Sequence, residues 1–142
     1  MNRLVRFTDV HPPTPKARAR HYLNKNTGRV GSYTPDKTTQ AEEYLRLAWR
    51  EAGAKKVEGP LTMKVTFWMP CPKSLPKKMQ GQPHTKRPDL DNLVKTLKDS
   101  LSGLAYDDDS QIWKLDACKL YSTVLVAPST AVSILAENGE AE

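Results

Sequence analysis

The sequence predicts a single mixed α/β domain, with a small mixed sheet and two main helices. Residues 60–70 (PLTMKVTFWMP) alternate apolar and polar side chains, as a strand with one buried face does. Residues 36–53 and 90–101 carry helical spacing, and β-rich segments lie before and after them. The predicted order is therefore β, α, β, α, β, β. A chain of 142 residues has the length of one ordinary domain.

The first third of the chain predicts a strand, a basic arm and a helix. Residues 4–10 are rich in β-branched and aromatic side chains, and the prolines that follow end the strand. Residues 11–35 carry turn signals without an apolar period, which predicts an exposed arm. Residues 36–53 are rich in helix formers; Thr34 or Asp36 is expected to cap the helix and Gly53 to stop it. We expect its buried face to include Tyr44, Leu47 and Ala48.

The rest of the chain predicts three more strands and a second helix. Residues 71–88 are rich in proline and basic side chains, which predicts a functional or mobile loop. The second helix ends before Gly103 and buries one apolar stripe. Residues 111–122 and 131–137 read as strands, and 138–142 as a frayed tail. The stripe consists of Leu90, Leu93, Val94, Leu97 and Leu101.

The positive charge is concentrated in two acid-free stretches, although the net charge is only +6. Basic side chains grouped in this way suit contacts with phosphates, although a solvated basic surface is the alternative. The first stretch lies within the arm and the second mostly within the loop. The candidate DNA contacts are Lys16, Arg18, Arg20, Lys73, Lys77, Lys78, Lys86 and Arg87.

Several classes of protein are disfavoured. No apolar run reaches membrane-helix length, and the N-terminus lacks the apolar core of a signal peptide, so we expect a cytoplasmic protein without a membrane partner. Cys71 and Cys118 lack CxxC spacing, which favours buried free thiols over a zinc site. No nucleotide cofactor is expected.

Acidic side chains gather around the second helix. Pro88 disfavours a helical residue before it, so Asp89 and Asp91 straddle a junction between loop and helix, where both carboxylates can aim at one point. The alternative is that Asp89 only caps the helix, and that Asp91, Lys95 and Asp99 form a row of surface ion pairs.

Three consecutive aspartates, Asp107, Asp108 and Asp109, follow the second helix. Adjacent like charges repel each other unless a positive charge compensates them. Oxygen ligands without His or Cys suit Mg²⁺ or Mn²⁺, although an Asp-rich turn is the simpler alternative. Together with Asp89 and Asp91, they predict a metal site that faces phosphates.

These motifs resemble one known family. R-P-D-L-D-N-L-x-K at 87–95, followed by Asp99 and Gly103 and then by D-D-S-Q-I at 108–112, resembles the RusA family of Holliday junction resolvases. Lys119 follows downstream at a basic position of the family pattern.

The N-terminal part carries a second likeness. PPTPKARAR at 12–20, followed by Tyr33, Thr34 and a helix, is similar to the opening of many phage-borne members. Ala19 departs from the pattern, because related sequences often have proline between the two arginines.

The resemblance implies a RusA-like homodimer that binds four-way DNA junctions and makes paired, symmetric nicks with Mg²⁺, for which Mn²⁺ can substitute. It places Asp89, Asp91 and Asp109 among the metal-binding aspartates, Lys95 as the catalytic lysine and Lys119 among the basic contacts. Asp107 and Asp108 leave the third ligand open. The alternatives are a non-catalytic DNA-binding accessory protein and a nuclease for other branched DNA.

Overall fold

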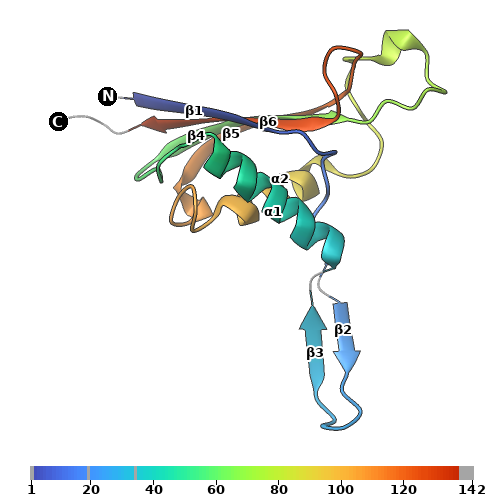
Figure 1. Cartoon of the computed structure of the whole chain (residues 1–142), viewed down its shortest axis with the longest axis vertical. Helices are drawn as coiled ribbons and strands as arrows, with labels where there is room; N and C mark the ends of the chain where they lie inside the picture. Colours follow the sequence, from blue (N-terminus) through green and yellow to red (C-terminus); the bar gives the residue numbers. More distant parts are fainter. Residues whose placement is uncertain (1, 19, 34, 138–142) are drawn as a thin grey trace.

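The structure has two layers, a four-stranded sheet and two helices that cover one of its faces (Figure 1). The computed structural model describes residues 2–18, 20–33 and 35–137. Thr34, Ala19 and the predicted tail lie outside them. The predicted single mixed domain with two main helices is confirmed. The elements of the two layers are β1 (Asn2–Asp9), α1 (Asp36–Glu51), β4 (Leu61–Met69), α2 (Leu90–Leu101), β5 (Ile112–Tyr121) and β6 (Ser129–Glu137).

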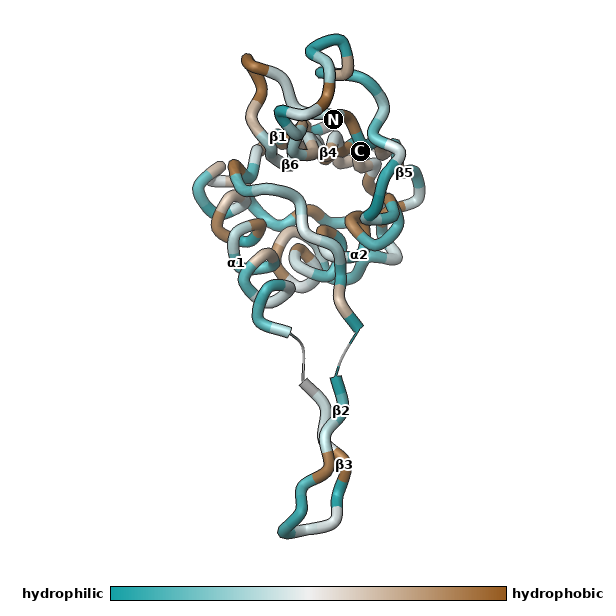
Figure 2. The backbone as a smooth tube through the Cα atoms, turned by 90° about the vertical axis from the view of Figure 1, so that its right-hand side faces the viewer, coloured by the Kyte–Doolittle hydropathy of each residue, from teal (hydrophilic) through white to brown (hydrophobic). Residues whose placement is uncertain are grey.

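The sheet is mixed, with the order β1-β6-β4-β5. β4 pairs with β5 in parallel and with β6 in antiparallel, and β6 also pairs with β1. A parallel pair needs a crossover, and α2 supplies it between β4 and β5. Figure 2 shows α1 beneath the β1 side of the sheet and α2 on the β5 side. The crossover helix α2 thus lies beside β5, the strand that follows it in the chain.

The apolar periodicity predicted β4 and α2 correctly. Alternate residues of β4, from Leu61 to Met69, are buried against the helices. Leu93, Leu97 and Leu101 of α2 are almost fully buried, as predicted. Gly103 follows the helix with a φ of 84°, a conformation that glycine adopts without steric cost.

The predicted buried face of α1 is wrong at Leu47, whereas Ala48 packs against the core as expected. Leu47 is 49% exposed, whereas Leu45 and Trp49 are buried, together with Thr38 and Ala41. Both stripes have helical spacing, but the observed one brings Trp49 into the core, where its ring meets Phe7 edge to face at 5.9 Å. The large aromatic ring therefore determines which side of the helix faces the sheet. Asp36 is the first helical residue and Pro35 takes the N-cap position, so Asp36 is not the cap.

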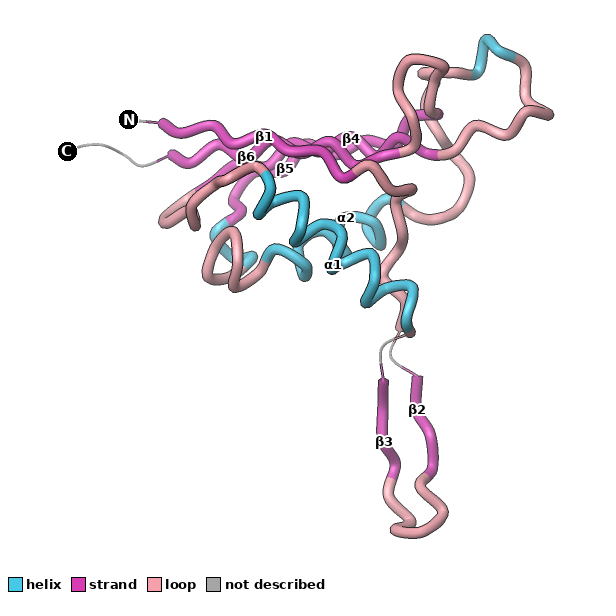
Figure 3. Tube along the Cα trace, in the orientation of Figure 1, coloured by secondary structure: helices cyan, strands magenta, loops and turns pink. Residues whose placement is uncertain are grey.

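The sequence did not predict the hairpin in the basic arm. β2 (Arg20–Leu23) and β3 (Val30–Tyr33) pair in antiparallel and project from the body (Figure 3). The Asn24 carboxamide oxygen accepts hydrogen bonds from the N–H groups of Asn26 and Thr27, which forms the turn. Every residue of β2 is exposed, so the strand lacks the alternating pattern that predicted β4.

The loop 71–88 lies partly along the free edge of β5. It contains a short 3₁₀ turn (Lys77–Met79), and its later part pairs with the end of β5 through Gly81, Gln82 and His84. Both cysteines are free and only half-buried. Within the described ranges, no helix has the length and apolar character needed to cross a membrane.

Candidate active site

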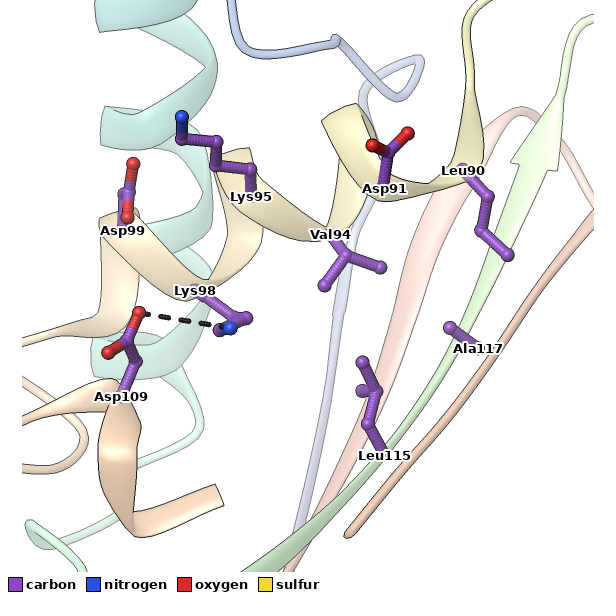
Figure 4. A pocket seen from close by; sticks show the side chains of 9 residues that line it. All are labelled: Leu90, Asp91, Val94, Lys95, Lys98, Asp99, Asp109, Leu115 and Ala117. Atoms are coloured by element: carbon purple, nitrogen blue, oxygen red, sulfur yellow. Dashed lines mark ion pairs between the residues drawn. The ribbon is translucent and has the colours of Figure 1, made fainter. Parts of the chain in front are cut away.

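The largest group of predicted site residues lines one cavity of about 660 Å³ between α2 and β5 (Figure 4). Its polar groups come from one side of α2 and from the turn that precedes β5, and its apolar groups come from α2 and β5. The lining residues are Leu90, Asp91, Val94, Lys95, Lys98, Asp99, Asp109, Leu115 and Ala117.

The cavity brings together three of the four predicted catalytic residues. Asp91 lies in the first turn of α2, Lys95 lies one turn later, and Asp109 lies just before β5. Asp89 does not line the cavity. It occupies the N-cap position of α2, but its exposed carboxylate makes no capping hydrogen bond, so it remains available for a ligand. Its role as a ligand stays a prediction.

The three consecutive aspartates have different surroundings. Asp107 is exposed and pairs with Lys56. Asp108 caps the short 3₁₀ helix Asp109–Gln111. Asp109 alone faces the cavity, where its carboxylate lies 3.9 Å from the Lys98 ammonium group. The geometry therefore favours Asp109 over its two neighbours as the residue that acts in the cavity.

Reciprocal hydrogen bonds fix the Asp-rich turn. The Asp108 carboxylate accepts from the Ser110 N–H at 3.2 Å, and hydrogen bonds from Ser110 lower the pKa of Asp108. The Gln111 side-chain oxygen accepts from the N–H groups of Asp107 and Asp108, at 2.8 and 3.1 Å. The Gln111 amide group also donates to the carbonyls of Val57 and Gly59. The turn contains Asp109, and the Gln111 side chain therefore links this turn to the segment before β4.

Gln111→Leu is expected to lower the free energy of unfolding by about 1 kcal/mol, because it removes four hydrogen bonds, of which only the one to the Val57 carbonyl is partly buried. Urea denaturation followed by circular dichroism measures the change. Gln40→Leu, at an exposed position of α1, is the matched control and should change stability far less. Equal stability of the two variants would contradict the role given to Gln111.

Tyr106 joins this turn to the end of α2. Its ring is fully buried, and its hydroxyl group donates to the Lys98 carbonyl at 2.9 Å. Burial raises the pKa of Tyr106 far above its usual value, and the charges of Asp109, Asp99 and Asp108 add to the effect. The hydroxyl group therefore keeps its proton and remains a donor. It holds the backbone of Lys98 near Asp109.

Lys16 fastens the start of the arm to both helices. Its ammonium group lies 2.8 Å from Glu42 of α1 and 3.3 Å from Asp99 of α2, and its N–H donates to the Asn92 carbonyl. Burial lowers the pKa of Lys16, but the hydrogen bonds and charges of Glu42 and Asp99 outweigh this effect and raise it. The residue remains charged and links the arm to a cavity residue. Its contact with DNA stays a prediction.

Lys119 supports the backbone before Asp89. Its ammonium group donates to the carbonyls of Lys86 and Pro88, at 2.7 and 2.6 Å. These bonds hold the end of the loop 71–88 against β5, where the chain turns into α2. A contact between Lys119 and DNA also stays a prediction. The other predicted DNA contacts, in the arm and in the loop, are exposed: Arg18, Arg20, Lys73, Lys77, Lys78, Lys86 and Arg87.

The donor chemistry of the cavity fits a hard divalent cation. Carboxylates line it, and no His or Cys does. Over the residues that the structure describes, no three Asp, Glu, His or Cys side chains form a ready metal site. Mg²⁺ commonly takes one or two protein carboxylates and fills its other positions with water and phosphate. Asp91 and Asp109 are side chains of this kind, but they lie at opposite ends of the lining, Asp91 at the start of α2 and Asp109 beside Lys98 (Figure 4).

Lys98 and Tyr106 are site residues that the sequence motifs did not predict. Asp91, Lys95 and Lys98 lie four and then three residues apart, so helical spacing predicts that they share one side of α2. This signal was available for Lys98. Tyr106 had no comparable signal, because its function depends on a contact with the Lys98 backbone. The alternative of a surface ion-pair row fails at Asp99, which pairs with Lys16.

Comparisons with known proteins agree with the motifs in the cavity. Residues 12–134 match the family described as Endodeoxyribonuclease RusA. The uncharacterized protein YqaN of Bacillus subtilis (strain 168) is 33% identical over 127 residues, which cover 83% of this chain and 88% of YqaN. The crossover junction endodeoxyribonuclease rusA of Lactococcus phage r1t is 47% identical over 62 residues, or 43% of this chain and 45% of the phage protein. Because the family match spans most of the sequence, this chain belongs to the RusA family of endodeoxyribonucleases.

Proposed function

We propose that the protein resolves four-way DNA junctions as a homodimer, by paired and symmetric nicks that require Mg²⁺. Membership of the RusA family and the printed name of the phage relative support junction cleavage. The observation that carries the proposal is the shared cavity of Asp91, Lys95 and Asp109. A substrate with two strands to cut suits a protein with two equivalent sites.

Asp91 and Asp109 would hold the cation, with Asp89 as a further ligand. A bound divalent cation stabilises the negative charge that develops on the phosphate and lowers the pKa of a bound water. Lys95 is exposed at the cavity and would stabilise the same charge electrostatically. The Lys98 ammonium group compensates the negative charge of the Asp109 carboxylate. The apolar side chains of Leu90, Val94 and Leu115 limit water on the sheet side of the cavity.

Two basic surfaces would hold the DNA backbone. The hairpin carries Arg20, Lys25 and Arg29, all of them exposed, and the loop carries the second group. Lys16 links the start of the arm to α1 through Glu42 and to α2 through Asp99, and the hairpin projects on the side of the sheet that the helices cover (Figure 1). Contacts of this kind give affinity without sequence information.

The test is cleavage of a labelled four-way junction, a linear duplex and a flap, each with Mg²⁺, with Mn²⁺ and with EDTA. The expected result is paired nicks in the junction only, with either metal and not with EDTA. Equal cutting of the duplex would remove the junction specificity. Junction binding without cleavage of any substrate would favour the accessory DNA-binding protein, and cleavage of the flap alone would favour the nuclease for other branched DNA.

A further inference from the structure

The tight loop between β5 and β6 exposes two large apolar side chains at its tip. Val124 is 85% exposed and Leu125 is 91% exposed, so the described chain leaves both side chains in water. The tip of such a loop usually carries Gly, Asn, Asp or Ser, which adopt turn conformations easily. Val and Leu add neither turn propensity nor core packing here. The fold therefore does not explain these two residues, and a contact with another molecule does.

Hydrogen bonds hold the backbone of the tip. The Thr123 hydroxyl oxygen accepts from the N–H groups of Leu125 and Val126, at 3.1 and 2.9 Å. The Thr123 N–H donates to the Val126 carbonyl at 2.9 Å. The Gln80 side-chain oxygen accepts from the Val124 N–H at 3.2 Å, which ties the tip to the loop 71–88. A tip that is already ordered loses little conformational entropy when it binds a partner.

The surroundings of the tip favour a nucleic acid as this partner. Residues 117–136 contain no Asp or Glu, and neither do residues 59–88. Gln80, which holds the tip, directly follows the short 3₁₀ turn that carries Lys77 and Lys78, and both lysines are exposed. Figure 1 shows the two loops at the same end of the sheet. Apolar side chains beside ammonium groups complement the base faces and phosphates of DNA.

We propose that Val124 and Leu125 form a wedge, which packs against the base-pair faces at the branch point of a four-way DNA junction. The proposal rests on the proposed function and names the contact that recognises the shape of its substrate. In a continuous duplex, an apolar wedge must first unstack a base step, which is unfavourable. At a branch point the stack of base pairs is already interrupted. The wedge therefore favours a junction over a linear duplex without reading the sequence.

The loop 71–88 connects the wedge to the candidate active site. Gln80 holds the tip, and the residues that follow it pair with the end of β5. The loop then ends at Pro88, directly before Asp89, and Lys119 donates to the Pro88 carbonyl at 2.6 Å. Resolving a junction requires nicks near its branch point. A branch point held at this end of β5 lies where the chain leads into Asp89 and α2.

The hairpin also exposes apolar side chains, but these have a role within the chain. Leu23 is 62% exposed and Val30 is 71% exposed. The two residues lie directly opposite each other in the β2–β3 register, where a cross-strand pair of apolar side chains stabilises a hairpin. Val124 and Leu125 are neighbours on one loop and lack such a pairing. The wedge is therefore assigned to the loop between β5 and β6.

Junction binding by matched variants tests the wedge. Val124→Ser/Leu125→Ser should weaken binding to a labelled four-way junction by roughly tenfold and leave binding to a linear duplex unchanged. Leu125→Ser alone should have a smaller effect of the same kind. Leu47→Ser, on the exposed side of α1, is the matched control for Leu125→Ser and should change neither affinity. Affinities are measured by fluorescence anisotropy in EDTA, and circular dichroism establishes that each variant is folded.

A fluorescent base locates the contact on the DNA. 2-Aminopurine is quenched while it is stacked between other bases. Its emission should rise when the wild type binds a junction that carries this base beside the branch point, and should not rise when the base lies within an arm. At saturating protein concentration, Val124→Ser/Leu125→Ser should abolish the rise. This readout does not depend on cleavage.

The outcomes separate the wedge from the nuclease. Junction affinity that the double variant leaves unchanged, equal losses of junction and duplex affinity, or an unaltered rise in emission would overturn the wedge. The first of these results would assign the tip to a protein partner instead. A wild type that binds junctions through the tip but cuts none would overturn only the nuclease. A double variant that binds and cuts junctions like the wild type would overturn only the wedge.

Discussion

Changing Asp91 to asparagine is expected to lower the rate of junction cleavage by at least about a hundredfold, and to leave junction binding unchanged or tighter. The substitution keeps the size and the helical position of the side chain but removes its charge. Asp91 is one of three aspartates that line the cavity, and the other two, Asp99 and Asp109, are paired with Lys16 and Lys98. Binding should not suffer, because a carboxylate near DNA phosphates repels them.

Asp36→Asn is the matched control for this substitution. Asp36 also lies in the first turn of a helix, α1, and is exposed, so the two variants lose the same interaction with the helix dipole. Cleavage is measured in single-turnover experiments with excess enzyme, and binding by fluorescence anisotropy in EDTA. The control should cut at the wild-type rate. Loss of binding together with cleavage in Asp91→Asn, or equal losses in both variants, would show that Asp91 is structural.

The sheet and α2 were predictable because their burial follows a period. Alternate residues of β4 from Leu61 to Met69 are buried, and so are Leu93, Val94, Leu97 and Leu101 of α2, so the apolar period determines which side of each element is buried. α1 shows the limit of this reasoning. Its sequence offers two helical stripes, and only the packing of Trp49 against Phe7 selects between them.

The sequence predicted which residue types form the candidate site, but not which of these residues faces the cavity and which makes structural contacts. Asp107, Asp108 and Asp109 are identical in the sequence, and contacts with Lys56, Ser110 and the cavity distinguish them. The same holds for basic residues. Lys16 and Lys119 resemble their exposed neighbours, but their ammonium groups bind Glu42, Asp99 and backbone carbonyls. Such long-range partners cannot be read from local spacing.

The hairpin leads to the second large prediction. Arg20→Gln, Lys25→Gln and Arg29→Gln together should weaken junction binding and reduce the slope of log affinity against log salt by about 2 to 3, as three lost phosphate contacts would. Lys16 is left intact, because its loss would release the arm from Glu42 and Asp99 and confuse the two effects. The affinity is measured over a series of salt concentrations in the Asp91→Asn background, which prevents cleavage.

A control variant separates the hairpin from net charge. Lys37→Gln, Arg50→Gln and Lys55→Gln remove the same charge from exposed positions on α1 and just after it. If the hairpin contacts the DNA backbone, only the hairpin variant should change the slope of log affinity against log salt. Counterions are released only where phosphates are contacted. Equal slopes in the two variants would mean that long-range attraction suffices, and that the projecting strands serve another purpose. If neither variant changed the slope, the loop 71–88 would be the inferred DNA-binding surface. Its exposed lysines would then be the next residues to neutralise.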